Sequence, residues 1–182
     1  NRFIEEFKKA SEKISPWLIN YTLGTYHINK AWEARGSGYA NTVAEDGWKV
    51  FKEQLLLADK HLQKAHRLKP EYPEAADQLI SVAQGGHSDQ STRHWFEVSV
   101  KAEIDFLPAY KSYLWDLFPR WSGSHEKMIA FGKECLDTKL YDTLVPSFFI
   151  EVLQRVNDER SDFKFINEYN LLPILHNTFK TY

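Results

Sequence analysis

Apolar residues recur every three or four positions along most of this chain, which is the spacing of one face of an α-helix. The longest example runs from Ala44 to Leu68, with a stripe made of Trp48, Phe51, Leu55, Ala58, Leu62 and Ala65. No segment shows sustained alternation of apolar and polar residues, the pattern of a half-buried strand. The pattern therefore predicts an all-α fold with little or no strand.

Serine, proline and glycine mark where these helices should begin and end. Ser15-Pro16 is typical of a helix start, and the glycines of the Gly36–Gly38 string should end that helix near Arg35. The polar stretch from Gly36 to Gly47 is expected to be a long loop. Helices are expected over 3–14, 16–35, 44–68, 74–83 and 91–102, from Pro108, from Ser124 through Cys135, and over 145–156, with one or two short helices interrupted by Pro173 after Asp162.

Three proline-bearing turns, at Pro70, Pro108 and Pro146, each separate two expected helices, and a helix pair lies between successive turns. Internal repeats of this kind are typical of solenoids, in which each unit packs on its neighbours.

The segment that ends at Pro70 resembles the second half of a tetratricopeptide repeat, through Ala58, Leu62 and Ala65 at the matching spacing. The next unit fits over a full repeat, with Leu79-Ile80 in its first helix, and Phe96 and Ser99 in its second. The first unit carries the 36–47 insertion, and the third unit, through Met128 and Cys135, fits only with a slipped register. The resemblance implies antiparallel helix pairs stacked as a short α-solenoid in one domain over residues 1–182. Because the chain starts with Asn1, that domain is expected to be a processed or trimmed piece.

Three further strings, at residues 31–38, 119–128 and 130–135, are similar to a bacterial family of uncharacterised, repeat-containing proteins, a domain of unknown function. The likeness covers Trp17 to about Pro146, although Ser122-Gly123 stands where the family has a pair of glycines. It implies a bacterial source and a repeat fold, and it implies no activity.

Charge and composition exclude several classes of partner. The formal net charge is −2 with no block of like charge, so no nucleic-acid binding is expected. No apolar run approaches the roughly 18 residues of a membrane helix, so membrane insertion is not expected. A soluble chain of this kind fits the bacterial cytoplasm or export equally, and its oligomeric state is left open. No phosphate loop or dinucleotide fingerprint is present, so no cofactor is expected.

Catalytic and metal-binding patterns are also missing from the sequence. His61 and His66 are five residues apart, which places them on different faces of a helix, whereas zinc helices use a step of four. Cys135 lies on an apolar stripe, which favours a buried small side chain over a nucleophile paired with His125. We therefore assign no catalytic residue and no metal site, and the sequence leans against an enzyme.

Two polar clusters deserve a functional hypothesis. His27 and Arg35 share a helix face that ends at the 36–42 loop, with Trp32 beside it. The second cluster consists of Arg120, Trp121, Ser124 and His125. Each cluster could lock a turn through capping and arginine–tryptophan stacking, or the two could meet in space and form a binding site.

The first helix of each tetratricopeptide repeat lines a concave groove, and the resemblance carries that role to eight positions here. They are Tyr21, Thr25 and Asn29, then Asp77, Ser81 and Gln84, then Lys111 and Trp115. This mixture of aromatic, amide and hydroxyl groups suits an extended peptide. It contains no cluster of basic residues, which argues against the carboxylate-clamp recognition of acidic C-termini.

The preferred interpretation is a scaffold that binds a protein or peptide partner, because the repeat pattern comes without a catalytic signature. The alternative is a small-ligand-binding or enzymatic domain that uses Arg35 and Arg120. A third interpretation is a structural spacer in a longer chain.

Overall fold

The computed structural model describes residues 14–121 and 123–181, and its regular elements there are all helical. The all-α prediction is confirmed for these residues, among which no strand occurs. The chain divides into two compact units, residues 1–122 and residues 123–182, and each is described by itself. The helix expected over Phe3 to Ile14 lies almost wholly outside the described residues.

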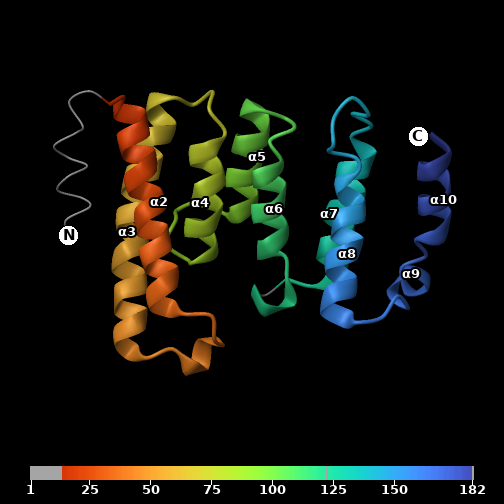
Figure 1. Cartoon of the computed structure of the whole chain (residues 1–182), viewed down its shortest axis with the longest axis horizontal. Coiled ribbons are helices and arrows are strands. Elements are labelled where there is room, and N and C mark those ends of the chain that lie inside the picture. Colours follow the sequence, from red (N-terminus) through yellow and green to blue (C-terminus); the bar gives the residue numbers. More distant parts are fainter. Residues whose placement is uncertain (1–13, 122, 182) are drawn as a thin grey trace. The chain divides into compact units, whose positions relative to one another are not determined.

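The first unit follows the expected order of helices closely (Figure 1). Ser15 accepts a hydrogen bond from the backbone N–H group of Leu18 and so caps its helix as the sequence predicts, and Ser91 caps another helix through the N–H group of His94. Single 3₁₀ turns occupy Ala40–Thr42 and Pro119–Trp121. The α-helices of this unit are α2 (Pro16–Arg35), α3 (Glu45–Leu68), α4 (Glu74–Gln84), α5 (Thr92–Ala102) and α6 (Leu107–Asp116).

Helices α2 and α3 lie side by side along their length (Figure 1). The approach is closest at Gly24, where an added Cβ would lie 2.4 Å from Leu62 Cγ. The predicted stripe of α3 is buried from Phe51 to Ala65. Trp48, at the start of the stripe, remains 37% exposed, so the core of this helix pair begins one turn after it.

Helix α4 packs against α2, α3, α5 and α6, and α5 also packs against α6. Two hydrogen bonds join neighbouring elements in the interior. The Ser99 hydroxyl donates to the Pro73 carbonyl at 3.0 Å, and the Ser112 hydroxyl donates to the Asp77 carboxylate at 2.6 Å. Asp77 is buried, and burial raises the pKa of its carboxyl group, although the hydrogen bonds from Ser112 and Gln78 act in the opposite direction.

In the second unit, α7 (His125–Asp137) packs against α8 (Phe148–Arg160), and α9 (Phe165–Glu168) and α10 (Leu172–Thr181) follow. The Ser124 side chain caps α7, as predicted. Helix α8 begins at Phe148 and not at the predicted Val145, because Pro146 lacks an N–H group and disfavours helical geometry in the residue before it.

The tail differs from expectation in one detail. The break between its two short helices lies at Tyr169–Leu171, where Asn170 has a φ of 50°. Pro173 lies in the first turn of α10, a position that tolerates the missing N–H group. Cys135 is buried on α7, which confirms its predicted packing role. Among the described residues, no helix combines the length and the apolar character needed to cross a membrane.

The contact between Gly24 and Leu62 gives a stability test. We expect Gly24→Ala to lower the free energy of unfolding by up to about 2 kcal/mol, because overpacking costs about 1–3 kcal/mol and the better helix propensity of alanine returns about 1 kcal/mol. Urea denaturation measures the change. Asn29→Ala, at an exposed position of α2, is the matched control with an expected change within about 0.5 kcal/mol. A Gly24→Ala variant at least as stable as the wild type would contradict this packing.

The buried Asp77 gives a pH test. A carboxyl group with a raised pKa favours the folded state when protonated, and that contribution is lost as the pH rises from the ordinary value of 3.8 through the folded-state pKa. Asp77→Asn stays neutral and keeps an oxygen for Ser112. Its stability relative to the wild type should therefore increase from acidic to neutral pH in urea titrations, whereas Asp105→Asn, at an exposed site, should show no such increase. A constant difference across the pH range would refute the burial argument.

Candidate functional site

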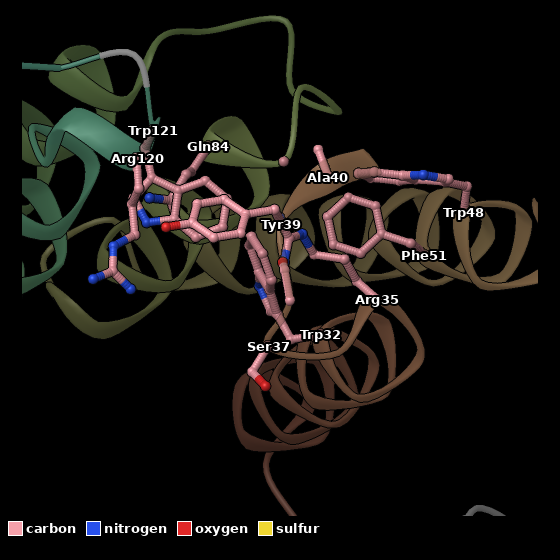
Figure 2. Close-up of a pocket in the computed structure, with 12 residues that line it drawn as sticks. Trp32, Arg35, Ser37, Tyr39, Ala40, Trp48, Phe51, Gln84, Arg120 and Trp121 are labelled. Atoms are coloured by element: carbon pink, nitrogen blue, oxygen red, sulfur yellow. The ribbon is translucent and has the colours of Figure 1, made fainter. Parts of the chain in front are cut away.

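A cavity of about 560 Å³ opens in the first unit, between the end of α2, the start of α3, the end of α4 and the turn after α6 (Figure 2). Its volume falls within the range of about 300–1,000 Å³ that is usual for small-ligand pockets. It is lined by Trp32, Arg35, Ser37, Gly38, Tyr39, Ala40, Trp48, Phe51, Gln84, Gly85, Arg120 and Trp121.

Arg35 is the last residue of α2, and its side chain reaches into the loop that follows. Its Nη1 donates hydrogen bonds to the carbonyl oxygens of Gly36 at 3.0 Å and Gly38 at 2.8 Å. Gly36 has a φ of 71°, a conformation that glycine adopts without steric cost, and it allows the chain to leave the helix at this point. The side chain thus fixes the first turn of the loop that forms one wall of the cavity.

Three tryptophan rings surround the Arg35 guanidinium. Its Cζ lies 4.9 Å from the ring centroid of Trp121, and 5.8 Å from those of both Trp32 and Trp48. Distances of this size allow cation–π attraction, worth about 0.5–2 kcal/mol for each pair depending on exposure. No carboxylate of the described residues lies within ion-pairing distance of Arg35. Aromatic faces and backbone carbonyls therefore hold this cation, and they do not neutralise its charge.

Close helix contacts bring the aromatic rings of the cavity together. A Cβ on Gly47 would lie 2.9 Å from the Ala34 carbonyl, so the start of α3 approaches the end of α2 closely. A Cβ on Gly85 would lie 2.2 Å from Leu55 Cδ1, so the end of α4 also approaches α3 closely. Glycine at these two positions permits the helices that form the cavity walls to meet. The Phe51 ring of α3 contacts both the Trp32 and the Trp48 rings edge to face.

The turn after α6 supplies the remaining wall. The Trp121 ring meets that of Trp32 edge to face at 5.5 Å, which joins this turn to α2. The Arg120 guanidinium lies over the rings of Trp115, at 5.3 Å, and Phe118, at 6.0 Å. Figure 2 shows Arg120 and Trp121 on one side of the cavity and Trp48 on the other, with Tyr39 between them.

The polar chemistry of this cavity is dominated by donors. Arg35 and Arg120 are permanently charged donors. The indole Nε1 of Trp121 and the amide Nε2 of Gln84 are enclosed, and neither has a hydrogen-bond partner among the described residues. The described residues that line the cavity include no carboxylate, imidazole or thiol. The arrangement suits a ligand that is rich in acceptors and negatively charged.

The structure brings three of the six predicted polar-cluster residues together within the first unit. Arg35, Arg120 and Trp121 line one cavity. His27 does not reach it: this residue is buried between α2 and α3, with its Nδ1 2.8 Å from Gln54 Oε1 and its ring stacked on His61. His125 is the first residue of α7 in the second unit, and its enclosed Nε2 has no hydrogen-bond partner among the described residues.

The eight predicted groove positions differ in burial and in the contacts that their side chains make. Tyr21 is half-buried and stacks on Trp17 at 5.3 Å, and burial raises the pKa of its hydroxyl group. Asp77 is buried and accepts the hydrogen bond from Ser112. Of the others, Thr25 and Ser81 are half-buried, Asn29, Lys111 and Trp115 are exposed, and Gln84 lines the cavity.

Sequence reasoning missed two residues of the aromatic wall, Trp48 and Phe51, and did not single out Tyr39 within the 36–42 loop. Trp48 and Phe51 read as the first two members of the α3 core stripe, and only Phe51 is buried. The signal that could have found Trp48 is its place at the amino end of a stripe, next to a glycine-rich loop, where little protein remains to cover it. Tyr39 is 80% exposed on that loop, and nothing in the local pattern marks it.

The two histidines of α3 face different neighbours. His61 faces α2, where its Nδ1 lies 3.1 Å from Asn20 Oδ1, whereas His66 faces the Trp95 ring. The two side chains therefore lie on different faces of α3, as the spacing predicts. Within the ranges 14–121 and 123–181, no three or more histidine, cysteine, aspartate or glutamate side chains gather in a group that could hold a metal ion.

Comparisons of the chain with protein-family models, with curated proteins and with solved structures found no match. The resemblances to tetratricopeptide repeats and to the uncharacterised bacterial family therefore stay predictions from the sequence. The functional argument rests on the cavity itself: two arginines and a tryptophan, predicted as parts of two separate clusters, line one concave site.

Proposed function

We propose that this chain is a recognition module, built from stacked tetratricopeptide-like helix pairs, that binds an anionic ligand in the cavity around Arg35 and Arg120. The module binds and does not catalyse. Its ligand is a small molecule with a carboxylate or phosphate group, held where the walls from α2, α3, α4 and the turn after α6 converge.

The helix contacts of the first unit support the repeat part of the proposal. Helix α2 pairs with α3, α4 pairs with α5, and α4 also contacts both α2 and α6. Contacts that link the first helix of each pair to the first helix of the next are what stacked repeats require. The 36–47 insertion, which interrupts the first repeat, contributes loop residues to the cavity wall.

The observation that carries the proposal is the shared cavity of Arg35 and Arg120, whose described lining includes no acidic residue. Guanidinium groups match carboxylate and phosphate oxygens in geometry as well as in charge. Partial enclosure by tryptophan rings lowers the local dielectric constant and strengthens the attraction for an anion. The same enclosure offers flat apolar surface to the carbon skeleton of a small ligand.

Binding is favoured over catalysis because the described lining offers no general base. Ser37 and Tyr39 carry the hydroxyl groups of the cavity, and no imidazole or carboxylate lines the cavity to activate them. Two permanently charged arginines can hold an anion, but they do not supply an acid–base pair.

A peptide partner is the second candidate, favoured by the succession of contacts from α2 to α4 to α6. Such a partner would lie along the first helices of the pairs and place an acidic side chain in the cavity. The groove positions support it less well, because Asp77 is buried and already bonded to Ser112. The small ligand is the better supported of the two.

The proposal is tested by titrating the protein with matched anionic and neutral probes and measuring heat by calorimetry. We expect benzoate and phenyl phosphate to bind, and benzamide and phenol to bind at least about tenfold more weakly, because the two arginines attract the negative charge of the anionic probes. Arg120→Ala should weaken anion binding by about tenfold or more, since a hydrogen bond to a charged group contributes about 1.5–3 kcal/mol.

Lys111→Ala is the matched control, because it removes an exposed cation of α6 that does not line the cavity. Its anion affinity should equal that of the wild type. Equal binding of charged and neutral probes, equal losses in Arg120→Ala and Lys111→Ala, or no binding of any anion would each overturn the proposal. Binding of acidic peptides alone would replace it with the second candidate.

A further inference from the structure

Two neutral donors of the cavity lack the partners that buried polar groups normally have. Native proteins pair most buried N–H groups, and an unpaired one costs about 1–3 kcal/mol. Trp121 Nε1 and Gln84 Nε2 are both enclosed, and neither has a hydrogen-bond partner among the described residues. They come from different elements, the turn after α6 and the end of α4, and they line the same cavity.

This coincidence distinguishes the two donors from other enclosed polar atoms of the chain. Trp17 Nε1, for example, belongs to an aromatic cluster with Tyr21 and Tyr72 and does not line the cavity. Asn157 Oδ1 lies in the second unit. Only at Gln84 and Trp121 do enclosed donors without partners, among the described residues, lie beside the two arginines.

The lining of the cavity also includes the loop after α2, with Ser37, Gly38, Tyr39 and Ala40. No residue of its 3₁₀ turn, Ala40–Thr42, is buried. A ligand atom that reaches the two enclosed nitrogens must displace part of this lining. Because no residue of the turn is buried, displacing it exposes little apolar surface.

We infer that the ligand carries, beside its anionic group, a neutral oxygen acceptor such as an amide carbonyl, a hydroxyl or an ether. This inference rests on the proposed function. Arg35 and Arg120 hold the carboxylate or phosphate, and the N–H groups of Gln84 and Trp121 donate to the neutral oxygen. The ligand class is an oxygen-substituted organic acid or phosphate ester. A purely hydrocarbon acid leaves both donors unpaired.

The experiment compares anions of similar shape that differ in a neutral oxygen-bearing group. Succinamate is matched with isocaproate, which has the same shape without the amide, and glycerol phosphate is matched with propyl phosphate. Calorimetry on the wild type should show a preference of about tenfold for the oxygen-bearing member of at least one pair. The pair that shows it distinguishes a carboxylate ligand from a phosphate ligand.

Two substitutions then assign the preference to its donors. Trp121→Phe keeps an aromatic face under Arg35 and removes the N–H group, and Gln84→Leu keeps the side-chain volume and removes the amide. Each should reduce the preference, taken as the ratio of the two affinities of a pair measured in the same variant, to about threefold or less. Urea denaturation confirms that both variants fold, and Gln84→Met replaces Gln84→Leu if that variant does not.

The outcomes separate this inference from the proposed function. Anions that bind and require Arg120, with no preference inside either pair, overturn the neutral-acceptor inference alone. A preference that persists in both variants also overturns the inference, because other groups must then donate hydrogen bonds to the neutral oxygen of the ligand. If no anion binds, the inference falls together with the proposed function.

Discussion

The close packing of α2 on α3 is the constraint on which the first unit depends. Gly24 lets Leu62 approach the α2 backbone, and Gly47 lets the start of α3 meet the end of α2. Because the two helices stay in contact along their length, Trp32 and Arg35 at the end of one arrive beside Trp48 at the start of the other. Packed helices therefore form much of the cavity wall, and the loop after α2 contributes only a part of it.

Electrostatics give the cavity its character. A cation held by tryptophan faces and backbone carbonyls keeps its full charge, whereas a salt bridge would largely cancel it. Elsewhere the chain uses the other arrangement: Arg160 makes a two-pronged ion pair with Glu168 and also approaches Asp162, and these carboxylates raise the pKa of the arginine. The contrast is between Arg35, whose charge no carboxylate of the described residues balances, and Arg160, whose charge is balanced by ion pairs.

The sequence predicted the helices well and the site only in part. Periodicity, capping serines and prolines place α2 to α6 almost residue by residue, because these signals are local. Arg35, Arg120 and Trp121 were marked as polar clusters, but their meeting is a tertiary event, set by contacts such as Gly85 against Leu55 that leave no local trace. Trp48 was predicted as a core residue for the same reason. Its spacing matches that of the buried stripe, but it lies at the end of the helix pair and is 37% exposed there.

The hydrogen bonds from Arg35 to the carbonyls of Gly36 and Gly38 have a consequence for how the site works. Any anion that accepts a hydrogen bond from Arg35 Nη1 competes with those two carbonyl oxygens. Anion binding and the conformation of the loop are therefore coupled, and the coupling free energy is the same whichever of the two is changed first. A change that stiffens residues 36–42 in the present geometry alters affinity, and a bound ligand alters the mobility of the loop to the same extent. The loop of residues 36–42 is then the part of the fold whose conformation responds to the filling of the cavity.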